Sequence, residues 1–131
     1  MSLENTAIYA GINVLFLMVL GLVVVRRRWT TRTSIGDGGN KLMMKAVRAH
    51  GNNAENLPTA ILIIAILESV GAPLALIHGL GIALTLGRFC HASGLYKTLG
   101  TSKRRVLGTV LTWSVFLVGG LTCIYYGAIS L

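Results

Sequence analysis

Residues 48–67, RAHGNNAENLPTAILIIAIL, join a strongly polar half to an almost purely apolar half. The polar half carries an arginine, a histidine, three asparagines and a glutamate. At 1.5 Å per helical residue, the apolar part from Leu57 to Leu67 covers only about 16 Å, whereas the hydrocarbon core of a bilayer is about 30 Å thick. Whether this segment crosses a membrane therefore decides the fold of the whole chain.

The rest of the chain is typical of an integral membrane protein. Of its 131 residues, 53% are hydrophobic and only 12% are charged, about half of the charged fraction that is usual in soluble domains. Residues 7–25 and 106–131 contain no charged side chain, and residues 73–86 are interrupted only by His78 and Thr85. Since roughly 20 apolar residues suffice for a helix to cross a bilayer, the first two stretches are predicted spans and the third is close to one.

Two clusters of cations decide whether residues 41–69 also cross. Arg26, Arg27, Arg28 and Arg32 follow the first apolar stretch, and Lys97, Lys103, Arg104 and Arg105 precede the last. Short basic loops stay on the cytoplasmic side of a membrane. The two clusters lie on that same side only if residues 41–69 cross, and the cation-free connector at 68–73 suits the outside. A crossing requires the polar residues 48–56 to enter the membrane as well.

The sequence therefore predicts an all-α integral membrane four-helix bundle with both termini outside and its basic loops in the cytoplasm. Residues 1–131 form one domain, with helices at about 6–28, 41–69, 73–96 and 105–130. The start, Met1-Ser-Leu-Glu-Asn-Thr, lacks a basic region and predicts an anchor rather than a cleaved signal peptide. Residues 36–39, Gly-Asp-Gly-Gly, predict a turn, and Asn40 is a candidate cap for the helix that follows.

The composition also argues against two classes of partner. A net charge of +8 is compatible with nucleic-acid binding, but the cations stand at the ends of apolar stretches, where they set membrane orientation. No nucleic-acid partner is expected. The three histidines do not have the spacing of metal ligands, so no metal site is expected either.

The polar residues of the second and third helices gather on faces. Arg48, Asn52 and Glu55 are spaced i, i+4, i+7 and share one face, while Thr85, Arg88 and His91 follow in steps of three on a broader one. An ionisable group within a membrane costs several kcal/mol unless it is paired or faces water. One interpretation is a Glu55–Arg88 ion pair between helices. The other is a cleft for an anionic, peptide-like ligand, in which arginines hold carboxylates while asparagine and glutamate hold amide and ammonium groups.

These residues resemble the signatures of a known family. The pattern Arg48-x-x-x-Asn52-x-x-Glu55, followed by Pro58, resembles the helix-two signature of the MAPEG family, the membrane-associated proteins in eicosanoid and glutathione metabolism. Residues 87–91, Gly-Arg-Phe-Cys-His, resemble its helix-three signature, and the resemblance covers nearly the whole chain. It implies a homotrimer in a membrane, expected to be a bacterial inner membrane, with glutathione bound between subunits near the cytoplasmic side.

The resemblance also implies roles for single residues. Arg104 or Arg105, near the start of helix four, would face the glutathione thiol and lower its pKa, because a cation favours the thiolate. The other implied glutathione contacts are Arg26, Arg48, Asn52, Glu55, Arg88 and His91. Two tyrosines that are usual in active members are replaced here by Asn56 and Leu95.

Three functions are therefore compared. The first is a glutathione-dependent transferase or peroxidase acting on hydrophobic electrophiles, with glutathione as co-substrate. The second is a membrane binding or scaffold protein that keeps the fold and has lost the chemistry. The third is a small multidrug exporter, which is disfavoured because such exporters hold a glutamate within helix one, whereas residues 7–25 contain no acid.

Overall fold

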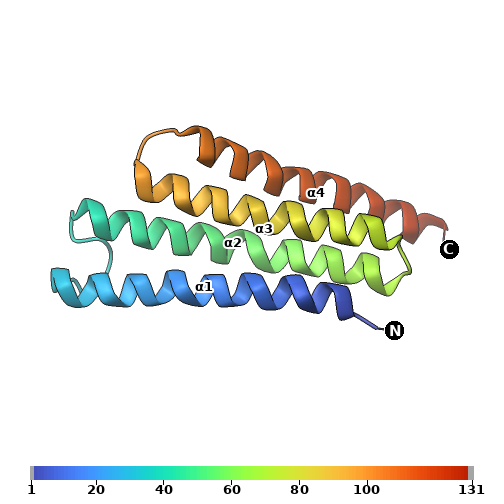
Figure 1. Cartoon of the computed structure of the whole chain (residues 1–131), viewed down its shortest axis with the longest axis horizontal. Coiled ribbons are helices and arrows are strands. Elements are labelled where there is room, and N and C mark those ends of the chain that lie inside the picture. Colours follow the sequence, from blue (N-terminus) through green and yellow to red (C-terminus); the bar gives the residue numbers. More distant parts are fainter. Residues whose placement is uncertain (1, 130–131) are drawn as a thin grey trace.

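The computed structural model describes residues 2–129 of the chain. Its four helices are α1 (Glu4–Thr31), α2 (Lys41–Ser69), α3 (Leu74–Lys97) and α4 (Lys103–Ile129). They lie side by side, with α2 and α3 in the middle and α1 and α4 packed on either side (Figure 1). The predicted all-α four-helix bundle is thus confirmed. Where the predicted helix ends differ from these bounds they do so by one to three residues, and the predicted end at residue 130 lies outside the described part.

The helices have the dimensions of membrane spans. α1, α3 and α4 are each long and apolar enough to cross a bilayer. α2 contains the polar stretch as well as Pro58, yet it continues as one helix of 29 residues, about 43 Å long. Because α2 lies between α1 and α3 along the bundle (Figure 1), its polar first half lies beside these two spans.

The connections divide the bundle into two ends. The start of α1, the α2–α3 connection and the end of α4 lie together at one end, which we call the terminal end (Figure 1). The α1–α2 and α3–α4 connections lie at the other, which we call the loop end. At the loop end, Lys45 on α2 contacts the end of α3. Its Nζ donates to the backbone oxygens of Tyr96 at 3.1 Å and Lys97 at 3.3 Å. Both basic clusters therefore share the loop end.

Short-range features of the α1–α2 connection follow its sequence. Asn40 Oδ1 accepts hydrogen bonds from the backbone N–H groups of Leu42 at 2.9 Å and Met43 at 3.1 Å, so the predicted cap is confirmed. In the predicted turn, Gly36, Gly38 and Gly39 have positive φ angles of 68°, 57° and 73°. Only glycine adopts this backbone region without strain, which explains the cluster of glycines.

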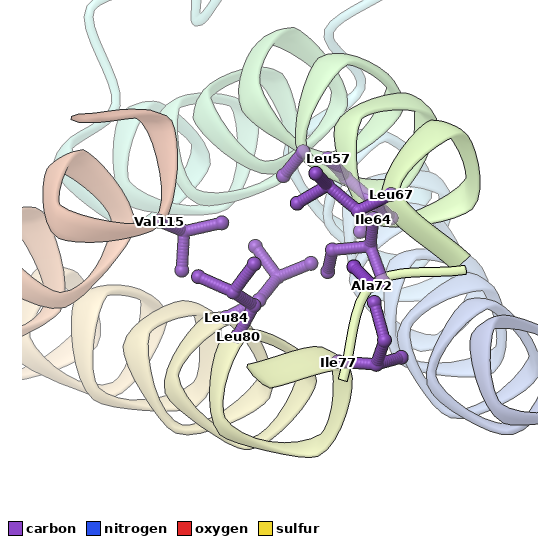
Figure 2. Close-up of a cluster of buried hydrophobic side chains, with 9 residues drawn as sticks. Leu57, Ile64, Leu67, Ala72, Ile77, Leu80, Leu84 and Val115 are labelled. Atoms are coloured by element: carbon purple, nitrogen blue, oxygen red, sulfur yellow. The ribbon is translucent and has the colours of Figure 1, made fainter. Parts of the chain in front are cut away.

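Most of the apolar core lies in the terminal half. Side chains from α2, α3 and α4 point toward one another there (Figure 2). This cluster consists of Leu57, Ala60, Ile64, Leu67, Ala72, Ile77, Leu80, Leu84 and Val115. A smaller cluster at the loop end consists of Leu20, Ala49, Ala92 and Leu95. The bundle is therefore packed unevenly along its length.

Glu68 makes a contact that the sequence did not predict. It lies in the last turn of α2, within the predicted helix at 41–69, and its side chain reaches the start of α1. Its carboxylate accepts from the backbone N–H groups of Asn5 at 3.0 Å and Thr6 at 2.7 Å, and also from their side chains at 2.7 and 2.5 Å. The first N–H groups of a helix lack partners within the helix and carry partial positive charge, so a carboxylate is favourable there. Glu68 thus caps α1 from another helix.

Candidate functional site

A buried arginine joins three helices in the loop half of the bundle. Arg88 on α3 is only 2% exposed. Its Nη1 donates to Asn52 Oδ1 on α2 at 2.9 Å, and its Nη2 donates to Thr112 Oγ1 on α4 at 2.5 Å. Thr112 in turn donates to the backbone oxygen of Gly108 at 2.8 Å. Neutral oxygens therefore hold this charge in place.

The predicted ion pair between Glu55 and Arg88 is wrong. Arg88 is held by Asn52 and Thr112, and the structure shows no ion pair between it and Glu55, whose side chain is exposed on the bundle surface. Glu55 follows Asn52 by three residues, about 60° around the helix. That rotation is enough to turn its carboxylate away from α3.

The predicted face of α2 opens outward from the bundle. Arg48 and Glu55 are exposed, and Asn52 between them is half-buried. The hydrogen bond from Arg88 holds Asn52 Oδ1 toward the interior of the bundle. The side-chain amide nitrogen of Asn52 is therefore the atom that can donate to a ligand. The Asn52 backbone oxygen accepts from Asn56 Nδ2 at 2.8 Å. We call Arg48, Asn52 and Glu55 the α2 face.

The other predicted residues of α3 separate in the structure. Thr85 belongs to the contact with α1, because its hydroxyl accepts from Asn13 Nδ2 at 2.8 Å and donates to the Gly81 oxygen at 2.8 Å. The broad face predicted for Thr85, Arg88 and His91 therefore meets different neighbours, since Thr85 contacts α1 whereas Arg88 contacts α2 and α4. His91 is 8% exposed and lies against α4, where Gly108 provides the space for its backbone.

The cations of the loop end differ in how firmly they are held. Arg105 is half-buried, and its Nη1 donates to the backbone oxygens of Gly100 at 2.7 Å and Leu99 at 3.0 Å. Arg104 and Arg26 are exposed, and neither forms a side-chain hydrogen bond or ion pair within residues 2–129. On α4, Arg105 precedes Thr112 by seven residues and so lies on the same helix face. It is thus a fixed cation on the side of α4 that faces Arg88.

Several buried polar groups were not singled out from the sequence. Thr112 and Asn13 each lie within a long apolar stretch. The only signal in the sequence was a polar side chain near the middle of a predicted membrane span. Asn53 is 2% exposed, and both atoms of its amide lack hydrogen-bond partners within the described residues, as does Arg88 Nε. Because Asn52 contacts Arg88, its neighbour Asn53 lies at the same level of the bundle. Unsatisfied donors and acceptors therefore collect beside the α2 face.

Apolar hollows lie on α4 beside this region. One of about 530 Å³ is bounded by Thr101, Ser102, Lys103, Val106, Leu107 and Val110. A smaller one of about 230 Å³ includes Arg105, and a third of about 570 Å³ continues past Trp113 to Leu117. Together they follow one side of α4 away from the Arg105 guanidinium. Within residues 2–129, no three His, Cys, Asp or Glu side chains are grouped as metal ligands.

Comparison with known proteins gives a consistent result. A family model described as the MAPEG family matches residues 6–125. The protein described as "Inner membrane protein YecN" from Escherichia coli strain K12 is 36% identical over 121 residues, which cover 92% of this chain and 91% of that protein. The protein of the same description from Escherichia coli O6:H1 strain CFT073 gives the same values. No solved structure matches the chain significantly.

Proposed function

The chain belongs to the MAPEG family and is an inner-membrane protein, and from that premise we propose that it is a glutathione-dependent transferase or peroxidase acting on hydrophobic electrophiles. The observation that carries the proposal is the α2 face, with Asn52 held in one orientation by buried Arg88. Arg48 offers a fork for a carboxylate, the Asn52 amide offers a donor to a peptide oxygen, and Glu55 offers an acceptor for an ammonium group. Glutathione carries all three of these groups.

The same face supports a homotrimer. Arg48 and Glu55 are exposed on α2, and a charge that contacts lipid within a membrane costs several kcal/mol. A second copy of the chain laid over this face would exclude lipid and enclose the ligand between subunits. The bound glutathione would then pair with the charges that the single subunit leaves unpaired.

Arg105 is the better of the two candidate arginines for the thiol. Its guanidinium is fixed by two backbone carbonyls and lies on the α4 face that carries Thr112, whereas Arg104 points into the surroundings. A fixed cation beside a thiol stabilises the thiolate and so lowers its pKa. The proton leaves to water, and the thiolate becomes the nucleophile at neutral pH.

The hollows on α4 suit the second substrate. They are lined mainly by apolar side chains and begin beside Arg105. A hydrophobic electrophile that enters from the membrane along α4 would place its reactive carbon next to the thiolate. In conjugation, sulfur forms a bond to that carbon while the leaving group departs with the electron pair, or an epoxide oxygen takes the pair and is then protonated.

The test is the absorbance of thiolate in the ultraviolet when glutathione is added to the purified protein near neutral pH. The wild type should give a saturable signal. Arg48→Ala should weaken binding by about tenfold to a hundredfold, because a charged hydrogen bond contributes about 1.5–3 kcal/mol. Arg105→Gln should bind glutathione but form thiolate only at higher pH. Lys41→Ala, which removes an exposed cation from the first turn of α2, is the control for lost charge. Absence of both binding and thiolate in the wild type would refute the proposal.

A scaffold function without chemistry is the second candidate, and Leu95 favours it. Leu95 is 5% exposed and packs in the loop-end cluster with Leu20 and Ala49. A tyrosine at this position would have to fit its ring and hydroxyl into that cluster, and leucine offers neither group to a ligand. Glutathione binding without thiolate formation would favour this candidate. The exporter remains disfavoured, since the only acid in α1 is Glu4, in its first turn.

A further inference from the structure

The outward side of α1 carries a stripe of apolar side chains. Leu15, Met18, Leu22, Val25 and Trp29 are spaced three or four residues apart, and each is more than half exposed. In a span of this length and hydropathy, acyl chains are the natural neighbours of such a stripe. Trp29, the most exposed of the five at 82%, ends it at the loop end.

A polar hollow lies at the end of this stripe. It has a volume of about 450 Å³ and is lined by Arg28, Trp29, Arg32, Thr33 and Ser34. Arg28 Nη1 fixes its wall by donating to the backbone oxygens of Ser34 at 2.8 Å and Thr33 at 3.3 Å. We call it the Arg32 pocket.

Arg32 supplies the free charge of the pocket. It follows the last residue of α1 in the left-handed conformation, with φ of 52°, and its backbone N–H bonds to the Arg28 oxygen. Within residues 2–129, its guanidinium forms no hydrogen bond or ion pair. Asp37, the acid of this connection, accepts from the N–H of Gly39. Five donors of a guanidinium are thus available to an anion.

We propose that the Arg32 pocket binds the phosphate headgroup of an anionic phospholipid, whose acyl chains lie along the α1 stripe. Arg32 and the Ser34 hydroxyl donate to the phosphate oxygens, while the Thr33 hydroxyl donates to the Thr31 backbone oxygen and lines the pocket. Trp29 lies at the boundary between headgroup and acyl chain, where tryptophan is favoured. Ile35, 89% exposed beside the pocket, enters the same boundary region. This inference is independent of glutathione binding and assigns the α1 side of the loop end to lipid.

The charge distribution favours this occupant over a second copy of the chain. Arg28 lines the pocket, and Arg26 and Arg27 precede it in the sequence of α1. A two-fold contact on this surface would place these cations against themselves. Because the chain has only four Asp and Glu residues, a copy docked through another of its faces could offer few acids to neutralise these cations. An anionic lipid neutralises them and also covers the stripe, which a soluble phosphate ion cannot do.

The test uses Trp29 as a reporter in the full-length chain. The chain has two tryptophans, so Trp113→Phe leaves Trp29 as the only one. This variant is placed in phosphatidylcholine vesicles that contain a minor fraction of phosphatidylglycerol, and the bromine quencher is carried either by the phosphatidylglycerol or by an equal amount of the phosphatidylcholine. Brominated phosphatidylglycerol should quench more strongly, because the pocket concentrates it beside Trp29.

Two further substitutions distinguish specific binding of the headgroup in the Arg32 pocket from non-specific electrostatic attraction of anionic lipid to the basic end of the bundle. A cation near a surface contributes about 1 kcal/mol to the attraction of anionic lipid, which corresponds to about fivefold in affinity. Lys97→Gln, at the same end of the bundle, should therefore weaken the preference by fivefold at most. Arg32→Gln also removes direct hydrogen bonds to the phosphate and should weaken it by more than about tenfold.

Each remaining outcome would overturn the proposal. Equal quenching by the two lipids would mean that the pocket does not select anionic headgroups. Equal losses for Arg32→Gln and Lys97→Gln would mean a diffuse field without a site. Competition by inorganic phosphate at the same phosphate concentration would identify a soluble anion site. Protection of Trp29 from both brominated lipids would mean that a second copy covers the stripe. Unchanged quenching by brominated phosphatidylcholine shows that Arg32→Gln has kept the fold.

Discussion

The terminal half and the loop half of the bundle satisfy their polar groups in different ways. In the terminal half, the larger apolar cluster fills the space between α2, α3 and α4, and the Glu68 carboxylate accepts four hydrogen bonds from Asn5 and Thr6. In the loop half, Arg88 Nε, both amide atoms of Asn53 and Tyr96 Oη are buried without partners within the described residues. A buried polar group without a partner costs about 1–3 kcal/mol.

This contrast separates stability from function. In the terminal half, packing within one subunit leaves a single buried side-chain atom without a partner among the described residues, Asn13 Oδ1. The loop half carries polar groups beyond what its own packing uses, together with the exposed charges of Arg48 and Glu55. Under the proposed function, bound glutathione and a second subunit supply the partners of these groups. Substitutions in the apolar core should therefore lower stability most in the terminal half, whereas substitutions of the exposed charged side chains in the loop half should affect ligand binding.

The largest expected effect is on stability in the terminal half. Ile64 is fully buried in the larger cluster, so Ile64→Ala should lower the free energy of unfolding by about 2–5 kcal/mol through lost packing contacts. Leu20→Ala, in the smaller cluster, should cost less because fewer side chains surround it. Unfolding of the detergent-solubilised protein in a denaturing detergent measures both. Equal losses would remove the contrast between the halves.

The next effect concerns the approach of α3 to α4. A Cβ at Gly108 would collide with the backbone of Gly87 and His91, whereas a Cβ at Gly120 meets open space. Gly108→Ala should therefore push the helices apart and cost about 1–3 kcal/mol, typical of overpacking. Gly120→Ala, on the same helix, is the matched control and should leave the unfolding curve unchanged. Identical curves for the two variants would contradict the close approach.

The cap on α1 has a smaller effect. Glu68→Gln keeps the shape of the side chain but removes the charge from the N-terminus of α1, which should cost about 1–2 kcal/mol. Glu4→Gln is the control, because Glu4 lies in the same first turn but is exposed. If both substitutions lower the free energy of unfolding equally, the hydrogen bonds of Glu68 contribute nothing beyond the interaction of its charge with the start of α1.

The smallest effect on stability is expected at Asn53. Asn53→Leu replaces an amide without partners by an apolar group of similar size, so stability should stay the same or rise by about 1 kcal/mol. Asn13→Leu, the comparison in α1, should be destabilising because it removes the hydrogen bonds to Thr85 Oγ1 and the Tyr9 oxygen. A large loss for Asn53→Leu would indicate that its amide is satisfied within the subunit.

The sequence predicted what depends on neighbours along the chain. Apolar stretches and basic clusters were enough to predict four helices, including α2. Asn40 and the glycines at 36–39 identified a cap and a turn because those interactions span only two or three residues. The i, i+4, i+7 spacing placed Arg48, Asn52 and Glu55 on one face, since helix geometry fixes the faces.

Interactions between helices could not be derived in the same way. Helical spacing does not fix the rotation of α2 relative to α3, so the partner of Arg88 was assigned to Glu55 and not to Asn52. The same ambiguity left open that Thr85 contacts Asn13 on α1. The cap by Glu68 connects it to Asn5 and Thr6, which lie 63 and 62 positions earlier in the chain. Nothing in the sequence around Glu68 or around Asn5 and Thr6 indicates this contact. Close approach at Gly108 depends on the backbone of another helix.

The most direct test of this account is a calorimetric titration of glutathione into the wild type, Arg48→Gln and Glu68→Gln. The account predicts saturable binding to the wild type, affinity weakened by about tenfold or more in Arg48→Gln, and unchanged affinity in Glu68→Gln despite its lower stability. The absence of binding to the wild type, or equal weakening by the two substitutions, would contradict the assignment of ligand binding to the loop half.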